Sequence, residues 1–149
     1  MNKLDLINKL NEDLTNEYTH MHFYLQSSFL VEGTYRHEVS EWLAEHAQSE
    51  FKHIQEFAKV IVGLGGVPVT NHHDFPNLTD PHDIFYHAQQ LEQEVVKNYV
   101  HRMVEVENSD LLDSCDAKYV ELFLEDQLLD SRGDLDEIKQ FLQTRVVSH

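Results

Sequence analysis

The chain has 149 residues, enough for one domain with a buried core and too few for two. Its 27 Asp and Glu residues outnumber 11 Lys and Arg residues, and the formal net charge of −16 argues against binding to nucleic acid or to an anionic membrane surface. Such a charge attracts cations. The single cysteine, Cys115, excludes a disulfide framework within the chain and a cysteine-rich zinc site.

The sequence gives no sign of membrane insertion or export. No segment approaches the ~18 uninterrupted apolar residues of a transmembrane helix. The polar start, Met1–Asp5, lacks the apolar core of a signal peptide. We therefore expect a soluble, cytoplasmic protein with one domain over residues 1–149.

The first half of the chain predicts two long helices, because apolar residues recur there with helical spacing and no strand-like alternation is found. The first helix is predicted over about Leu4–Val31, and Glu32-Gly33-Thr34 ends it. The second is predicted over about His37–Leu64, and Gly65-Gly66 ends it.

The second half predicts two more helices. The third starts near Asp80, an acidic cap followed by Pro81, and continues to Glu107. The fourth is predicted from about Asp116, continuing with a bend near Gly133 to about Gln143. The residues expected to face inward on this fourth helix are Tyr119, Leu122 and Phe123.

The link between the second and third helices, residues 65–80, is unusually long for a compact domain. Fully extended it can reach roughly 50 Å, and each of the first three helices is about 40 Å long. The link, which we call the crossover, can therefore run the length of the molecule. These features predict an all-α four-helix bundle with one long crossover between the second and third helices.

Charged residues occupy core positions on three of these helices. Glu17 lies on the apolar stripe of the first helix, Glu50 and His53 on that of the second, and Glu92 on that of the third. A buried ionised carboxylate is strongly unfavourable unless it is paired or binds a metal, and no Lys or Arg lies on these stripes. We therefore predict these four residues as ligands of a dinuclear metal centre, with iron or manganese as the ion.

The roles of several further residues stay open at this point. On the fourth helix, Asp126, Gln127 and Asp130 follow the predicted inward face, and any of them could complete the second metal position. Tyr24 is either a core residue or a hydrogen-bonding or redox group near the metals. His46 is interpreted as a core histidine.

Four segments resemble the ferritin family. They are Leu10-Asn11-Glu12 with Glu17-Tyr18 and Tyr24, His46–His53, Leu64–Pro68, and Tyr119–Phe123 ahead of Asp126-Gln127. The resemblance extends over nearly the whole chain, which is most similar to bacterial non-haem ferritins and bacterioferritins.

The resemblance implies that Glu17, Glu50 and His53 hold one iron, with Glu50 bridging to a second. It implies that Glu92 binds the second iron and that Gln127 lies close to it. The implied activity is that of an iron-storage ferroxidase, which binds two iron ions per subunit, oxidises Fe(II) with O₂ or H₂O₂, and stores Fe(III) in a homo-oligomeric cage.

The chain also departs from the family pattern. Bacterioferritins repeat Glu-x-x-His on the last helix, where this chain has Gln127 and Asp130, so the second iron should be held more weakly; a shift of one residue would make Asp126 the ligand. Phe51 replaces the haem-binding methionine, so we expect no haem. Ser49 replaces an acid of an auxiliary iron site, which argues against a third iron.

The sequence leaves more than one possibility for the size of the assembly and for the activity. The chain ends at His149 without the short helix usual in 24-subunit ferritins, so a shell of 12 or 24 subunits or a dimer is compatible with it. The rivals to iron storage are a non-storing diiron oxidase or peroxidase resembling rubrerythrins and a structural bundle with a degenerate metal site.

Overall fold

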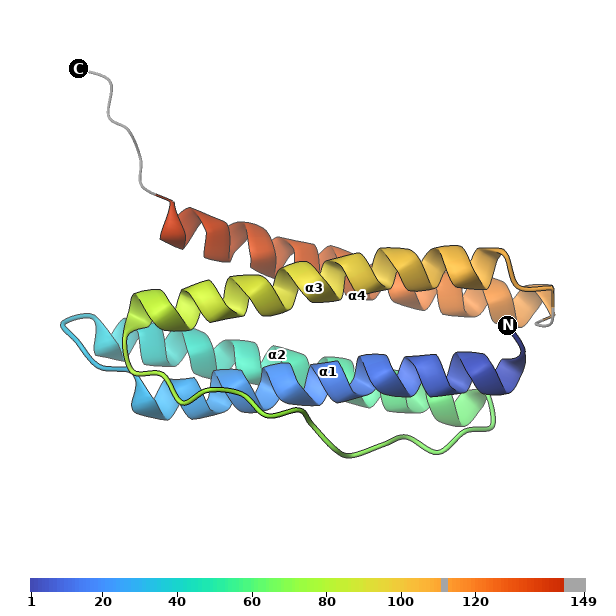
Figure 1. The fold of residues 1–149 in the computed structure, drawn as a ribbon, viewed down its shortest axis with the longest axis horizontal. Coiled ribbons are helices and arrows are strands. Elements are labelled where there is room, and N and C mark those ends of the chain that lie inside the picture. The colour runs from blue at the N-terminus through green and yellow to red at the C-terminus, as the bar shows by residue number, and fades with distance from the viewer. Residues whose placement is uncertain (111–112, 144–149) are drawn as a thin grey trace, which may run out of the picture.

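The computed structural model describes residues 1–110 and 113–143. Its four long helices are α1 (Lys3–Leu30), α2 (Arg36–Gly63), α3 (Pro81–Glu107) and α4 (Ser114–Leu142) (Figure 1). α1 packs on α2 and α3 packs on α4. The prediction of an all-α four-helix bundle is confirmed, and every predicted helix end lies within one or two residues of the observed one. Within the described residues, the helices lack the length of apolar sequence that a membrane span requires.

The crossover runs along α1 for most of the length of the bundle (Figure 1), as predicted. Polar side chains of α1 hold it there. The Asn11 amide donates to the Val67 carbonyl at 3.1 Å, and its Oδ1 accepts from the Val69 N–H at 2.9 Å. Two turns later, the Thr19 hydroxyl accepts from the His73 N–H at 2.9 Å. The crossover therefore forms a wall of the bundle rather than a free loop.

A glycine is needed where the crossover leaves α2. A Cβ added at Gly66 would lie 2.5 Å from Ile7 Cγ2 and 3.0 Å from Ile61 Cγ2. The preceding Gly65 has a φ of 92°, a conformation that glycine adopts without strain. This pair lets the chain turn sharply while staying packed against α1.

Two apolar clusters fill the interior, with a polar layer between them. On α1 the first cluster includes Leu14 and the second Phe23, and on α3 the first includes Val95 and the second Ala88. The residues of the polar layer, all at most 3% exposed, are Glu17, His20, Glu50, His53, Glu92, Gln127 and Ser131. All four helices therefore place polar side chains at the middle of the bundle.

The predicted inward face of the fourth helix is wrong. Tyr119 and Leu122 are 55% and 50% exposed, whereas Val120 and Leu124 are fully buried; Phe123 packs partly buried at the edge of the first cluster. The buried face of α4 contains Val120 and Leu124 and continues through Gln127 and Ser131 of the polar layer. This face therefore carries few apolar residues, and the exposed face beside it carries Tyr119 and Leu122. Apolar spacing alone therefore favoured the wrong side of this helix.

A buried ion pair away from the polar layer ties α1 to α3. The Arg102 guanidinium donates from Nε to Asp13 Oδ2 at 3.0 Å and from Nη2 to Asp13 Oδ1 at 3.2 Å. Its Nη1 donates to Glu105 at 2.7 Å. Burial raises the pKa of Asp13 to about 6, although Arg102 opposes that shift. The pair thus carries a desolvation cost that only the two-point contact offsets.

Candidate metal centre

The first carboxylate–histidine group joins α1 and α2. Glu17, Glu50 and His53 offer ligand atoms that all lie within 4.8 Å of one another. His53 Nδ1 is 3.4 Å from Glu50 Oε2 and 3.6 Å from Glu17 Oε2, and all three side chains are buried. The structure thus brings together three of the residues that the sequence pointed to, in a geometry that could hold one metal ion.

The second group joins α1, α2 and α3. It consists of His20, Glu50 and Glu92, again within 4.8 Å of one another, and His20 Nδ1 is 3.6 Å from Glu92 Oε1. Glu50 belongs to both groups, so each of its two oxygens could bind a different ion. We call the five residues of the two groups the centre.

Sequence reasoning missed His20. It lies one position off the apolar stripe of α1, yet it is 3% exposed. A signal was present, because Glu17 and His20 have the same Glu-x-x-His spacing as Glu50 and His53. The repeated motif is therefore on α1 and α2.

Buried atoms without a hydrogen-bond partner gather in the polar layer, and they test whether a metal fits there. Among the described residues they include Glu17 Oε1 and Oε2, Glu50 Oε2, Glu92 Oε2, His20 Nδ1 and His53 Nδ1. An unpartnered buried oxygen or nitrogen is costly. Carboxylate oxygens with imidazole nitrogens form a donor set suited to iron or manganese, so the residues present fit such ions.

Burial and mutual repulsion perturb the acids of the centre. Burial, reinforced by the charge of Glu17, raises the pKa of Glu50 to about 8. Burial also raises the pKa of Glu92, although His20 opposes this. Burial would lower the pKa of His53, but the nearby carboxylates of Glu17 and Glu50 outweigh it and raise the value to about 12. Without metal, protons therefore balance part of the negative charge.

α4 contributes to the surroundings of the centre and not to its two groups. His53 Nε2 donates to Asp130 Oδ2 at 3.3 Å, which leaves Nδ1 facing Glu17 and Glu50. The Asp130 side chain is 64% exposed. This is the usual arrangement of a carboxylate that orients a metal-binding histidine. Asp130 therefore contacts His53, a candidate metal ligand, on the side away from Glu17 and Glu50, whereas the sequence suggested Asp130 itself as a possible ligand.

The other two α4 candidates, Gln127 and Asp126, differ in burial. Gln127 is buried, but its Nε2 donates to Glu56 Oε2 at 2.7 Å. Asp126 is exposed and lines a surface pocket with Gln127 and Glu56. Neither acid of this stretch, Asp126 or Asp130, belongs to the two buried groups. The histidine of the second buried group is His20 of α1.

Tyr24 hydrogen-bonds to the centre. Its hydroxyl donates to Glu92 Oε1 at 2.8 Å, and the ring is fully buried. Burial, together with the charges of Glu92 and Glu50, raises the pKa of Tyr24 well above its ordinary value. Tyr24 thus remains a neutral donor that orients Glu92.

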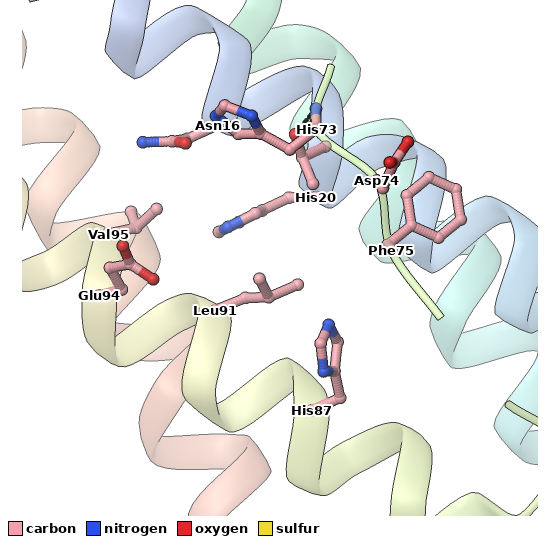
Figure 2. Close-up of a pocket in the computed structure, with 10 residues that line it drawn as sticks. Asn16, His20, His73, Asp74, Phe75, His87, Leu91, Glu94 and Val95 are labelled. Atoms are coloured by element: carbon pink, nitrogen blue, oxygen red, sulfur yellow. Dashed lines mark hydrogen bonds between the residues drawn. The ribbon is translucent and has the colours of Figure 1, made fainter. Parts of the chain in front are cut away.

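A pocket of about 230 Å³ lies beside the centre and is lined by one of its residues, His20 (Figure 2). It lies between α1, α3 and the crossover, and His20 projects into it from α1. Glu94 and His87 of α3 and Asp74 of the crossover also line it. Since His20 Nδ1 is near Glu92, this residue connects the pocket with the buried carboxylates.

Comparisons with solved structures give the same fold over nearly the whole chain. A ferritin-like, diiron-carboxylate protein from Bacillus anthracis str. Ames is 27% identical, with 95% of this chain and 97% of that chain covered and a TM-score of 0.85. The bacterioferritin of Desulfovibrio desulfuricans is 17% identical, with 94% and 79% covered and a TM-score of 0.83.

A third structure, the dodecameric thioferritin from Bacteroides fragilis, is 24% identical, with 95% of this chain and 90% of that chain covered and a TM-score of 0.66. None of the curated proteins matches the chain. The model of the ferritin-like domain family, in contrast, matches residues 7–144. With a four-helix bundle, a long crossover and two carboxylate–histidine groups at its middle, the chain belongs to the ferritin-like domain family.

Proposed function

We propose that this protein is an iron-storage ferroxidase that oxidises Fe(II) at a dinuclear site within each subunit. The observation that carries the proposal is the position of Glu50, which belongs to both buried carboxylate–histidine groups. A carboxylate shared in this way can bridge two ions, and two adjacent ions can deliver two electrons to one oxidant.

Each iron would have its own ligands in addition to the bridge. Glu17 and His53 would hold the first ion, and His20 and Glu92 the second, with Glu50 between them. Asp130 would orient His53, and Tyr24 would orient Glu92. These contacts leave a nitrogen of His53 and an oxygen of Glu92 directed at the ions.

The proposed reaction balances with either oxidant. Two Fe(II) ions lose one electron each, and the electrons with two protons convert H₂O₂ to two water molecules or O₂ to H₂O₂. Hard, anionic carboxylates favour the Fe(III) product. The first iron has two carboxylates and one imidazole available, and the second has the same set, so both are suited to the oxidised state.

Fe(II) would reach the centre through the pocket that ends at His20. Glu94 and Asp74 carry negative charge at its wall and would attract a hydrated cation. A volume of about 230 Å³ has room for several water molecules. A hydrated ion can therefore enter before exchanging its water for protein ligands.

Storage requires a closed assembly of subunits. The net charge of −16 supplies the acidic surface that the interior of an iron cage needs. The thioferritin relative is dodecameric, which supports a homo-oligomer of this chain. We propose a cytoplasmic cage, with 12 or 24 subunits as the expected sizes.

The test is aerobic titration of the purified protein with Fe(II), followed by desalting and measurement of the iron that stays with the protein. We expect rapid oxidation and retention of many iron ions per chain. Retention of about two per chain would instead support a non-storing diiron oxidase or peroxidase. Slow oxidation without retained iron would support a structural bundle.

A further inference from the structure

A third group of possible metal ligands lies near the centre, at the junction of α2 and α4. His46 comes from α2, and Asp134 and Glu137 come from consecutive turns of α4. Their ligand atoms lie within 4.8 Å of one another. The side chains are 14%, 19% and 57% exposed, so the group opens to solvent on one side.

The orientation of His46 leaves one nitrogen for a ligand. Its Nδ1 is 2.9 Å from the Trp42 carbonyl oxygen, and because a carbonyl only accepts, Nδ1 carries the proton. The other nitrogen, Nε2, is 3.4 Å from Asp134 Oδ1 and 4.0 Å from Glu137 Oε2. Metal-binding histidines are commonly oriented in this way by a backbone carbonyl behind the ring.

Trp42 holds two members of the group in place. Its ring stacks on His46 with centroids 3.5 Å apart and planes 20° apart. Its indole Nε1 donates to Glu137 Oε1 at 3.0 Å, so the other oxygen of Glu137 is the one that faces His46. The positions of an imidazole and a carboxylate are therefore fixed by one residue that is not itself a ligand.

The group adjoins the centre without sharing a residue with it. The rings of His46 and Tyr24 are 5.9 Å apart, and the Tyr24 hydroxyl contacts Glu92. Burial is the main cause of the raised pKa of Glu92, and the charges of Glu50 and, to a smaller extent, Asp134 add to it, whereas His20 lowers it. An ion bound by Asp134 would therefore act on the electrostatics of the buried acids.

We propose that His46, Asp134 and Glu137 bind a divalent transition-metal ion such as Fe(II), separate from the two ions of the centre. One imidazole nitrogen and two carboxylate oxygens suit such an ion, and the open side leaves positions for water. This site does not include position 49, where Ser49 replaces the acid of the auxiliary site. The proposal rests on this geometry and stands without the proposed ferroxidase activity.

The single tryptophan of the chain provides the test. Because Trp42 stacks directly on His46, paramagnetic Co(II) bound there should quench its fluorescence. We would titrate the metal-free protein with Co(II) without oxygen and count bound cobalt by equilibrium dialysis. We expect saturable quenching in the wild-type protein, with Asp134→Asn and Glu137→Gln each weakening the quenching transition at least tenfold and removing one equivalent of bound cobalt.

Two further variants separate this site from the centre. Asp136→Asn removes the same charge from α4 but affects an exposed pair with Arg132, so it should titrate like the wild type. Glu17→Gln should lose cobalt from the centre and keep the quenching transition that depends on Asp134. If Asp134→Asn and Glu137→Gln quench and bind cobalt as the wild type does, the group is an ion pair of His46 and the proposed site is refuted. If Glu17→Gln binds cobalt as the wild type does while Asp134→Asn and Glu137→Gln bind less, the proposed centre is refuted and the site at His46 is supported.

Discussion

His20 Nδ1 lies 3.6 Å from Glu92 Oε1, so a histidine of α1 meets a carboxylate of α3 where family resemblance placed ligands from the last helix. The two buried carboxylate–histidine groups thus come from three helices, and Asp130 of α4 contacts one of their histidines, His53. The proposed division of ligands between two ions depends on this position of His20.

Replacing the shared carboxylate should remove both metals together. Glu50→Gln keeps the shape of the side chain but not a charge that can bridge two ions. We expect initial Fe(II) oxidation to fall about 100-fold or more, because both ions lose a ligand. Stopped-flow absorbance measures this rate. Glu45→Gln, an exposed change on the same helix, is the control and should leave the rate unchanged; a Glu50→Gln protein with wild-type rates would refute the bridge.

The two histidines should each control one ion. We expect His53→Ala to weaken the ion held with Glu17, and His20→Ala to weaken the ion held with Glu92. Anaerobic Co(II) binding with visible absorption spectra should show one equivalent lost from the centre in each variant, and different residual spectra. Loss of both equivalents in His20→Ala, or of neither, would contradict the division of ligands.

The stability of the metal-free protein should rise as the pH falls from about 8 to about 5. Glu50 has a folded pKa of about 8 against a model value of 4.5, so the folded state binds its proton first and gains stability across that window. Asp13, raised to about 6, acts in the same direction at the lower end. His53, raised to about 12, loses its contribution as the pH rises above 6.5.

Thermal unfolding of the metal-free protein across this range measures the effect, and we expect the midpoint to increase by several degrees on acidification. The iron-loaded protein should show the opposite trend, because metal binding requires deprotonated ligands. If the thermal midpoint of the metal-free protein instead decreases as the pH is lowered, the buried acids are ionised and paired in a way that this geometry does not provide.

The ion pair of Asp13 and Arg102 should matter for stability and not for oxidation. Arg102→Met leaves a buried carboxylate without its two-point partner, and we expect a loss of about 3 kcal/mol in the free energy of unfolding. Urea unfolding measures it. The double variant with Asp13→Leu should recover most of that loss, since it leaves no charge unpaired. A double variant no more stable than Arg102→Met would contradict this explanation.

The pocket carboxylates should influence the rate of iron uptake. Glu94→Gln with Asp74→Asn removes two negative charges from the wall of the pocket. We expect Fe(II) oxidation at limiting iron to slow roughly tenfold at low salt, with a smaller effect at high salt because screening weakens attraction. Glu125→Gln, an exposed change on α4, is the control. Equal salt dependence in all three proteins would show that iron enters elsewhere.

Much of this structure could be predicted from the sequence because the relevant signals are local. Gly65-Gly66 and Pro81 mark helix ends, and the length of the crossover determines which topology is possible. Glu17 and Glu92 were found because a charge at a core position conflicts with burial unless something binds it.

The remaining features depend on tertiary packing. The face of α4 was misjudged because its buried stripe contains Gln127 and Ser131, polar residues whose burial an apolar pattern does not predict. His20 was missed because it lies beside the apolar stripe of α1, and only its approach to Glu92 reveals its place in the centre. Polar residues that are buried at a functional site interrupt the apolar spacing from which the buried face of a helix is predicted.

The polar layer also divides the molecule into two apolar blocks, one containing Leu14 and Val95 and the other Phe23 and Ala88. Cooperative unfolding depends on contacts that join such blocks, and here the joint consists of acids and histidines that repel or leave atoms unpartnered. Bound ions would turn this weak joint into the strongest one in the bundle. Bound iron would therefore determine whether the two ends of the protein unfold together or separately. The ions that the protein stores would then also stabilise its fold.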